Sequence, residues 1–149
     1  VLTGDYQASF AFEVAKNPLY SDSYNPATGA GELAVEVVCP ALTSLAVTEP
    51  NTGPDVNPHQ KFNNQTDHDY MILDITEQAF QCEWYYTDTL TVRDSSTRFA
   101  KGLVTQSRAH HLVDAAQSRP ISNVAALAAA DKAVSVKKTT TNPAAMREA

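Results

Sequence analysis

The stretch YMILDITEQAFQCEWYYTDTL, residues 70–90, carries the clearest structural signal in this sequence. Apolar and polar side chains alternate over residues 70–76 and again over residues 79–87, and a period of two is typical of β-strands. The residues TEQ at 76–78 favour a turn between these runs. The sequence therefore predicts a β-hairpin with one apolar face. On the returning strand that face carries Phe80, Cys82, Trp84 and Tyr86.

Further strands are expected on both sides of this hairpin. Residues 33–39 are almost continuously apolar and end at Pro40, which favours a strand covered on both faces. In residues 10–14, Phe and Val alternate with Ala and Glu, which indicates a weak strand or a short helix. Downstream, we expect a strand at about residues 99–106 and a short one at residues 111–113.

The chain opens on a short apolar run, residues 1–3, that stops at Gly4 and Asp5. This pattern indicates a buried strand that delivers a carboxylate to a loop. A single strand buries nothing by itself, and the neighbouring sequence offers no partner. We therefore expect this strand to be buried on both sides, largely by another polypeptide segment.

Two long segments read as loops. Residues 16–32 are rich in Pro, Gly, Asn, Asp and Ser, the usual chemistry of turns. Residues 48–69 show no periodicity over about twenty positions. Loops of that length are uncommon in compact domains and are often functional, with a plain surface excursion as an equally weighted alternative.

The aromatic residues divide the chain into two parts. All Phe, Tyr and Trp residues lie within residues 1–113. Residues 114–149 consist largely of Ala, Ser, Thr and Lys, so they can bury little surface and form at best a marginal helix. We expect a folded domain over residues 1–113, incomplete at its N-terminus, and a low-complexity Ala/Thr/Lys tail over residues 114–149.

Charge and cysteine content narrow the possible functions. The net charge of −6 at pH 7 argues against a nucleic-acid-binding surface, which needs clustered Lys and Arg. No run approaches the ~18 apolar residues of a membrane-spanning helix, so we expect no transmembrane segment. Cys39 and Cys82 lie in apolar runs, which favours buried free thiols over a disulfide.

Asp5 is the first candidate for a metal ligand. A carboxylate that directly follows a buried strand, beside a flexible glycine, is well placed to hold a hard cation or iron. Ordinary turns use the same Gly-Asp pair. Gln7 could hydrogen-bond to a ligand, but its side-chain amide is a poor ligand for a transition metal.

The four histidines show no zinc-binding spacing. His59 follows the stiff pair Asn57-Pro58 and is the most notable of them. We expect His68 to be a solvated loop residue. The sequence contains neither a nucleophile elbow nor a glycine-rich phosphate loop.

Four segments, in order, resemble motifs of the alkaline phosphatase D (PhoD-like) metallophosphatases. VLTGDYQASFA resembles T-G-D-x-H-x-S-x-A, and VEVVCPALTS resembles V-E-F-x-x-P-S-x-T-S. NPHQKF resembles N-P-H-x-K-[YF]. DYMILDITEQAFQCEWYYTDTL resembles G-Y-x-x-x-D-[VI]-T-x-x-x-x-x-x-[ED]-[WY]-[WYF]-x-x-D-T. The likeness covers about residues 1–113 and represents the C-terminal part of such an enzyme.

This resemblance implies the C-terminal portion of a calcineurin-like α/β (α+β) sandwich, present here mostly as strands and long loops. It also implies a polynuclear metal centre, with calcium and iron, that hydrolyses phosphate mono- or diesters. The missing N-terminal part of the same enzyme would be the partner needed for activity, and a phosphate ester would be the substrate. Family members are exported by the twin-arginine route, which implies a periplasmic or extracellular protein.

The resemblance places Asp5 on the family's metal-ligand aspartate. Gln7 falls where the family has a histidine, and an amide cannot replace imidazole as a basic ligand. Asn57 and His59 fall on a motif near the family's active site, without an assigned role. No catalytic residue is assignable in this chain, because the remaining ligands would lie upstream.

Two alternatives remain at this stage. Gln7 favours a non-catalytic structural or interaction module derived from the same fold. Strand content alone would also suit a β-sandwich binding domain.

Overall fold

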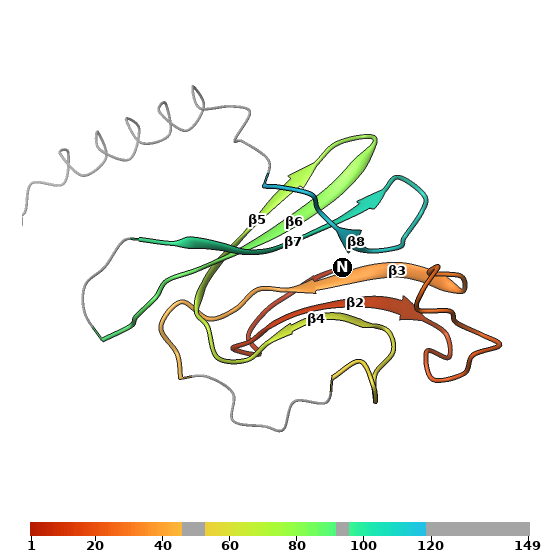
Figure 1. Ribbon diagram of the computed structural model, residues 1–149, viewed down its shortest axis with the longest axis horizontal. Coiled ribbons are helices and arrows are strands. Elements are labelled where there is room, and N and C mark those ends of the chain that lie inside the picture. Colours follow the sequence, from red (N-terminus) through yellow and green to blue (C-terminus); the bar gives the residue numbers. More distant parts are fainter. Residues whose placement is uncertain (46–52, 92–95, 119–149) are drawn as a thin grey trace, which may run out of the picture. The chain divides into compact units, whose positions relative to one another are not determined.

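A computed structural model of the chain describes residues 1–45, 53–91 and 96–118. The described residues form two four-stranded sheets and no helix (Figure 1). The strands are β1 (Leu2–Thr3), β2 (Ser9–Ala15), β3 (Glu32–Val38), β4 (Gln60–Asn64), β5 (Asp69–Ile75), β6 (Ala79–Tyr86), β7 (Arg98–Gln106) and β8 (Val113–Asp114). The first sheet has the order β1-β3-β2-β4, and the second has the order β5-β6-β7-β8.

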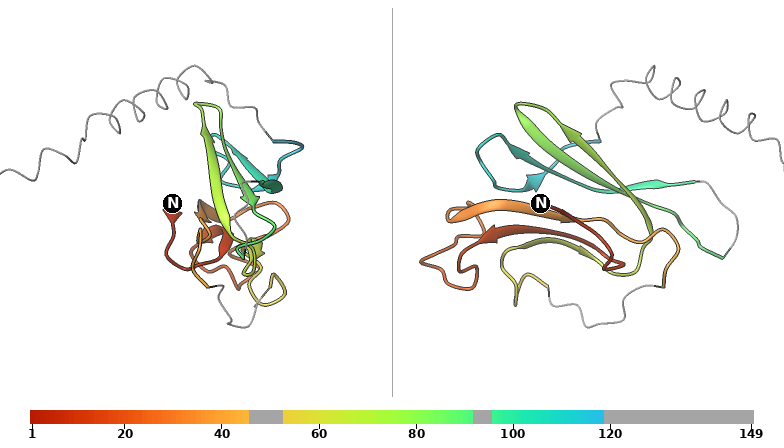
Figure 2. Two further views of the ribbon diagram at one scale, coloured as in Figure 1. Left: turned by 90° about the vertical axis from the view of Figure 1, so that its left-hand side faces the viewer. Right: turned by 180° about the vertical axis from the view of Figure 1, so that it is seen from behind.

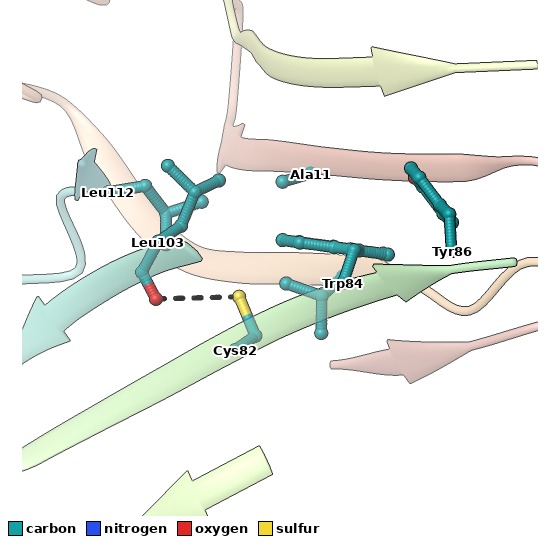
Figure 3. Close-up of a cluster of buried hydrophobic side chains, with 7 residues drawn as sticks. Ala11, Cys82, Trp84, Tyr86, Leu103 and Leu112 are labelled. Carbon is teal, nitrogen blue, oxygen red and sulfur yellow. Dashed lines mark hydrogen bonds between the residues drawn. The ribbon is translucent and has the colours of Figure 1, made fainter. Parts of the chain in front are cut away.

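The predicted hairpin is confirmed as β5 and β6, which pair antiparallel with Leu73 opposite Cys82. The predicted apolar face of β6 points into the core, where Cys82 and Trp84 are fully buried and Tyr86 is almost so (Figure 3). Strand β7, predicted at residues 99–106, is confirmed on the other side of β6.

The main core lies between the two sheets, which Figure 2 shows from the side and from behind. Its buried members are Ala11 and Val37 from the first sheet, Cys82, Trp84, Tyr86 and Leu103 from the second, and Leu112. Two hydrogen bonds join the sheets across this core. The indole Nε1 of Trp84 donates to the carbonyl oxygen of Val38 at 3.2 Å, and the Tyr86 hydroxyl donates to Ser9 Oγ at 2.6 Å.

The opposite face of β6 is buried as well, although it is polar. Gln81 and Glu83 are both less than 5 % exposed. Glu83 accepts hydrogen bonds from the Gln81 amide at 2.6 Å and from the Tyr85 hydroxyl at 2.7 Å, and Gln81 also donates to the backbone oxygen of Gln117. These bonds allow β6 to be covered on both faces, because buried polar groups are tolerated when they are hydrogen-bonded.

The expected burial of the first strand is wrong for this chain. Strand β1 lies at the edge of the first sheet and pairs with β3 alone, in parallel. Val1 and Leu2 are 67 % and 57 % exposed.

The burial on both faces expected for residues 33–39 is also wrong for most of β3. Only the end of β3 is buried, at Val37 and Val38, whereas Val35 packs against the core and is only partly buried.

Strand β4 lies inside the region predicted to be a long loop, residues 48–69. It pairs antiparallel with β2, with a bulge between Ala11 and Phe12. Its sequence QKFNN contains a single apolar residue, so no alternation of apolar and polar residues predicted this strand. Part of the predicted loop, residues 48–52, lies outside the described residues.

The second strand, the loop after it, the last strand and the cysteines agree with the sequence to different degrees. Residues 10–14 adopt the strand alternative, as β2. Residues 16–31 form turns, as expected for a loop. The short last strand begins at Val113, two residues later than predicted. Both cysteines are free, as expected, and burial raises the pKa of Cys82 to about 12.

The division into residues 1–113 and 114–149 stays a prediction, since most of the tail, including its marginal helix, lies outside the described residues. Within the described residues, no helix is long and apolar enough to cross a membrane.

Candidate functional site

The loop that joins β1 to β2 holds Asp5 and Gln7 in an unusual backbone conformation. Their φ angles are 66° and 64°, in the left-handed region that residues other than glycine rarely adopt. Such strain costs on the order of 1–3 kcal/mol per residue and clusters at functional sites. Both residues are exposed. The loop therefore presents a carboxylate and an amide to solvent at one end of the first sheet.

Asp5 and Gln7 line the same cavity, of about 430 Å³. Its other wall is the segment that follows β3. The lining residues are Asp5, Gln7, Cys39, Pro40, Ala41, Leu42, Thr43, Ser44 and Tyr70. The two motifs TGD and VEVVCPALTS, which are far apart in sequence, thus meet in this cavity, which we call the Asp5 cavity.

Asn57 and His59 line a different cavity, of about 420 Å³, which we call the His59 cavity. Its wall is aromatic, since Phe10 stacks on Phe12 with ring centroids 5.5 Å apart, and Phe12 contacts the His59 ring at 5.6 Å. Gly4 lines this cavity too, whereas its neighbour Asp5 lines the other. The β1–β2 loop therefore contributes to both cavities.

The four predicted site residues are consequently brought together in pairs rather than as one group. Asp5 shares a cavity with Gln7, and Asn57 shares another with His59. Burial lowers the pKa of the His59 imidazole, and its Nδ1 atom is buried without a hydrogen-bond partner. A neutral His59 ring against an aromatic wall is better suited to contact a ligand than to neutralise the charge of one.

His68 was expected to be solvated, and this is wrong. It is only 7 % exposed, and its Nε2 lies 2.6 Å from the backbone oxygen of Ser44, which accepts the hydrogen bond. Thr87 in turn donates its N–H to the backbone oxygen of His68 at 3.1 Å. His68 thereby fixes Ser44, one of the residues lining the Asp5 cavity.

A further polar cluster, not expected from the sequence, surrounds Glu13 on β2. The Glu13 side chain is completely buried. Its Oε1 accepts hydrogen bonds from His111 Nδ1 and from the backbone N–H of Leu112, each at 2.7 Å. Its Oε2 accepts one from the Tyr24 hydroxyl at 2.5 Å and lies 3.3 Å from Lys61 Nζ. One carboxylate thus joins β2, β4 and two loops.

Glu32, the first residue of β3, completes this cluster. Its Oε2 lies 3.6 Å from His111 Nδ1, and its side chain is 6 % exposed. Burial, and then the nearby charge of Glu13, raises the pKa of Glu32 from 4.5 to about 7. Burial and the hydrogen bond to Glu13 likewise raise the pKa of the Tyr24 hydroxyl. Glu13, Glu32 and His111 are a group that could hold a metal ion.

The free energy of unfolding should fall as pH rises, because Glu32 holds its proton more tightly in the folded state than in the unfolded state. The folded state holds a proton on this carboxyl up to about pH 7, whereas the unfolded state releases it near its ordinary pKa of 4.5. The contribution of Glu32 is therefore fully present below about pH 4.5 and is lost as pH rises through about 7. Relative to a Glu32→Gln variant, the wild-type free energy of unfolding should drop by on the order of 2 kcal/mol over this range.

Urea denaturation at several pH values, with a chelator present, measures this difference. The facing titratable groups Glu13, Lys61, Tyr24 and His111 are the same in both proteins, so their contributions largely cancel in the comparison. Parallel pH profiles for the two proteins would contradict the raised pKa.

The sequence offered little signal for this cluster. Glu13 looks like the polar residue of an alternating strand, yet the buried face of β2 carries Ser9, Ala11 and Glu13. His111 is separated from Glu13 by 98 positions. Only pairing of β2 with β3 and β4, and the return of the chain before β8, places these residues together.

Comparisons with known proteins give one informative result. No family model matches the chain, and no curated protein matches it. A solved structure described as "Structure of PhoD" matches with a TM-score of 0.62 and 19 % sequence identity. The match covers 82 % of this chain and 23 % of that chain. At this identity the likeness establishes the fold alone: this chain is folded like a part of PhoD that makes up less than a quarter of it.

Proposed function

We propose that this chain is the C-terminal part of a PhoD-like enzyme that hydrolyses phosphate mono- or diesters with the help of bound metal ions. The observation that carries the proposal is the fold likeness to PhoD. It is supported by the strained β1–β2 loop, which turns Asp5 and Gln7 into a shared cavity. In this proposal the two sheets belong to a calcineurin-like sandwich, and upstream segments supply its remaining strands and ligands.

The donors of the Asp5 cavity fit a hard cation better than iron. The cavity offers the Asp5 carboxylate, the Gln7 amide and the hydroxyls of Thr43 and Ser44, and calcium takes oxygen ligands of these kinds. No imidazole lines it. Burial raises the pKa of the Cys39 thiol, so this cysteine is a protonated and weak ligand. We therefore assign Asp5 to a calcium ion and leave the iron ligands to the upstream part.

The proposed roles of this chain are binding and positioning. A bound metal ion in such a centre polarises the phosphoryl oxygens and lowers the pKa of a water molecule. Asp5 holds that ion, and the left-handed backbone on both sides of Tyr6 fixes the direction of the carboxylate. His59, which lines the neighbouring cavity, contacts the substrate as a neutral ring. Export to the periplasm or the extracellular space belongs to the same proposal.

The second candidate is a structural or interaction module without catalysis. Gln7 favours it, because the matching position in the family motif is a histidine. The exposed edge of β1 also favours it, since an edge strand offers unpaired backbone groups to another chain. In that case the protein binds no metal in stoichiometric amount and hydrolyses no phosphodiester.

Substitution of Asp5 tests the proposal in the intact protein that contains this chain. Asp5→Asn should remove both the metal and the hydrolysis of a chromogenic phosphodiester, because a neutral amide replaces the charged ligand. Gln7→His should preserve or raise activity. The matched control is Asp55→Asn, at an exposed turn residue, which should change neither. Metal analysis with the activity assay provides both readouts.

Full metal content and full activity in Asp5→Asn would contradict the ligand assignment. Absence of metal and of hydrolysis in the wild type would instead establish the non-catalytic alternative. The 149-residue chain by itself should be inactive in the same assay.

A further inference from the structure

The Glu13 cluster contains a buried oxygen that the protein leaves without a hydrogen bond. The Glu32 side chain is 94 % covered, and its buried Oε2 atom has no hydrogen-bond partner. It faces His111 Nδ1 at 3.6 Å. Gly29 lies close to the same oxygen, since a Cβ atom added there would be 2.2 Å from it. An unsatisfied buried oxygen costs about 1–3 kcal/mol, so the position calls for a proton or a cation.

Three side chains that can act as metal ligands come together at this position from separate segments. Glu13 comes from β2, Glu32 from the start of β3, and His111 from the loop before β8. Their ligand atoms all lie within 4.8 Å of one another. The distance from His111 Nδ1 is 2.7 Å to Glu13 Oε1 and 3.6 Å to Glu32 Oε2. Ligands of a tetrahedral zinc ion, bound at about 2.0–2.1 Å, lie about 3.4 Å apart, so small shifts would accommodate an ion.

The hydrogen bonds of Glu13 leave one of its oxygens facing this position. Lys61 and Tyr24 both contact Oε2, whereas Oε1 is shared by His111 Nδ1 and the backbone N–H of Leu112. An ion between Oε1, Glu32 and His111 therefore need not displace the lysine. Lys61 nevertheless lies close enough to weaken the binding of a cation. His111 is 22 % exposed, which gives an ion a path from solvent.

We propose that Glu13, Glu32 and His111 form a binding site for a divalent transition-metal ion of the zinc type. Two carboxylates and an imidazole are ligands that zinc accepts, with an open fourth position. Calcium and magnesium prefer a shell made up of oxygen ligands, whereas this group includes an imidazole nitrogen, which suits a transition-metal ion. Binding requires Nδ1 to release to solvent the proton that it donates to Glu13 Oε1, and the metal-bound imidazole is neutral with its proton on Nε2.

This site is separate from the proposed phosphatase centre. Asp5 and Gln7 precede the first residue of β2, whereas Glu13 lies four residues further along the strand, or about 13 Å at 3.3 Å per residue. Neither Glu32 nor His111 lines the Asp5 cavity or the His59 cavity. The site holds together the loops at the opposite end of the first sheet, so its role is to stabilise the fold.

Zinc binding to the 149-residue chain tests this inference directly. Titration calorimetry should show one Zn²⁺ per chain, and saturating Zn²⁺ should raise the melting temperature by roughly 5–15 °C. Calcium and magnesium should produce no rise. Affinity should increase from about pH 6 to about pH 8, because the ligands must lose their protons. A cobalt ion in place of zinc should give visible d–d absorption, a readout that needs no substitution.

Variants locate the ion and separate the two proposals. Glu32→Gln should fold well, since Gln has nearly the same size and shape as Glu, and should weaken Zn²⁺ binding at least tenfold. His111→Gln should do the same, while Lys61→Met should strengthen binding severalfold. Glu77→Gln, at an exposed turn residue, and Asp5→Asn should bind as the wild type does.

Lack of saturable Zn²⁺ binding by the wild-type chain would overturn the inference. So would affinity within twofold of the wild type in both Glu32→Gln and His111→Gln. A loss of Zn²⁺ in Asp5→Asn would place the ion in the Asp5 cavity and would also overturn it. The first two outcomes leave the proposed hydrolysis by the intact protein untouched, and the third would support Asp5 as a metal ligand while it overturns the site at Glu13.

Discussion

Truncation of Trp84 to alanine should lower the free energy of unfolding by about 3–5 kcal/mol, the usual cost for a large aromatic residue in a packed core. Trp84 is completely buried, and its ring centroid lies 4.8 Å from that of Phe62 on β4. The substitution removes this contact, opens a cavity and leaves the backbone oxygen of Val38 without its indole donor. Because Trp84 lies on one sheet and contacts the other, its loss should weaken the packing between the two sheets.

Urea denaturation followed by circular dichroism measures this change. Tyr20→Ala is the matched control, since Tyr20 is an aromatic residue that is 66 % exposed, and surface substitutions cost less than about 1 kcal/mol. A loss below about 1 kcal/mol for Trp84→Ala would show that the face of β6 shown in Figure 3 is not the core.

Removal of the Glu13 carboxylate should be about as costly. Glu13→Ala deprives Lys61, Tyr24 and His111 of a shared partner at once. Breaking a buried ion pair by removing one partner typically costs about 3–5 kcal/mol, because the other charge stays buried and uncompensated. The backbone N–H of Leu112, which is buried, also loses its acceptor.

The same denaturation experiment, with a chelator present, gives this value independently of any bound ion. Glu77→Ala serves as the control, since an exposed glutamate should cost within about 0.5 kcal/mol. A double substitution with Lys61→Met should recover part of the loss, because no largely covered ammonium group then remains without its carboxylate partner. Equal stability of Glu13→Ala and the wild type would mean that the cluster contributes nothing to the fold.

Local pattern was sufficient for the strands that carry large side chains at a period of two. The β5–β6 hairpin and β7 were predicted at nearly their observed positions, because Val, Ile, Tyr, Phe and Trp both favour strands and fill the core. The polar strand β4 was missed for the converse reason. Its place is determined by pairing with β2, and a short run of Gln, Lys and Asn contains no sign of that partner.

The candidate site likewise combines local and long-range features. The sequence placed Asp5 directly after a strand, and the structure agrees with that local placement. Whether Asp5, Gln7, Asn57 and His59 share one cavity depended on how the β1–β2 loop turns. The left-handed φ angles of Asp5 and Gln7 send neighbouring residues to different cavities, and no motif predicts such a turn.

By itself, the sequence determined the hairpin and the apolar face of β6, because each depends on side chains close together along the chain. The tertiary structure alone decided which charged groups are buried. Glu13 looks like a solvent-facing residue until β3, β4 and the loop before β8 enclose it. Glu32 has a raised pKa because the surrounding chain buries it and because the charge of Glu13 lies nearby. Pairing between strands that are distant in the sequence determines which carboxylates are buried, and burial in turn shifts their pKa values.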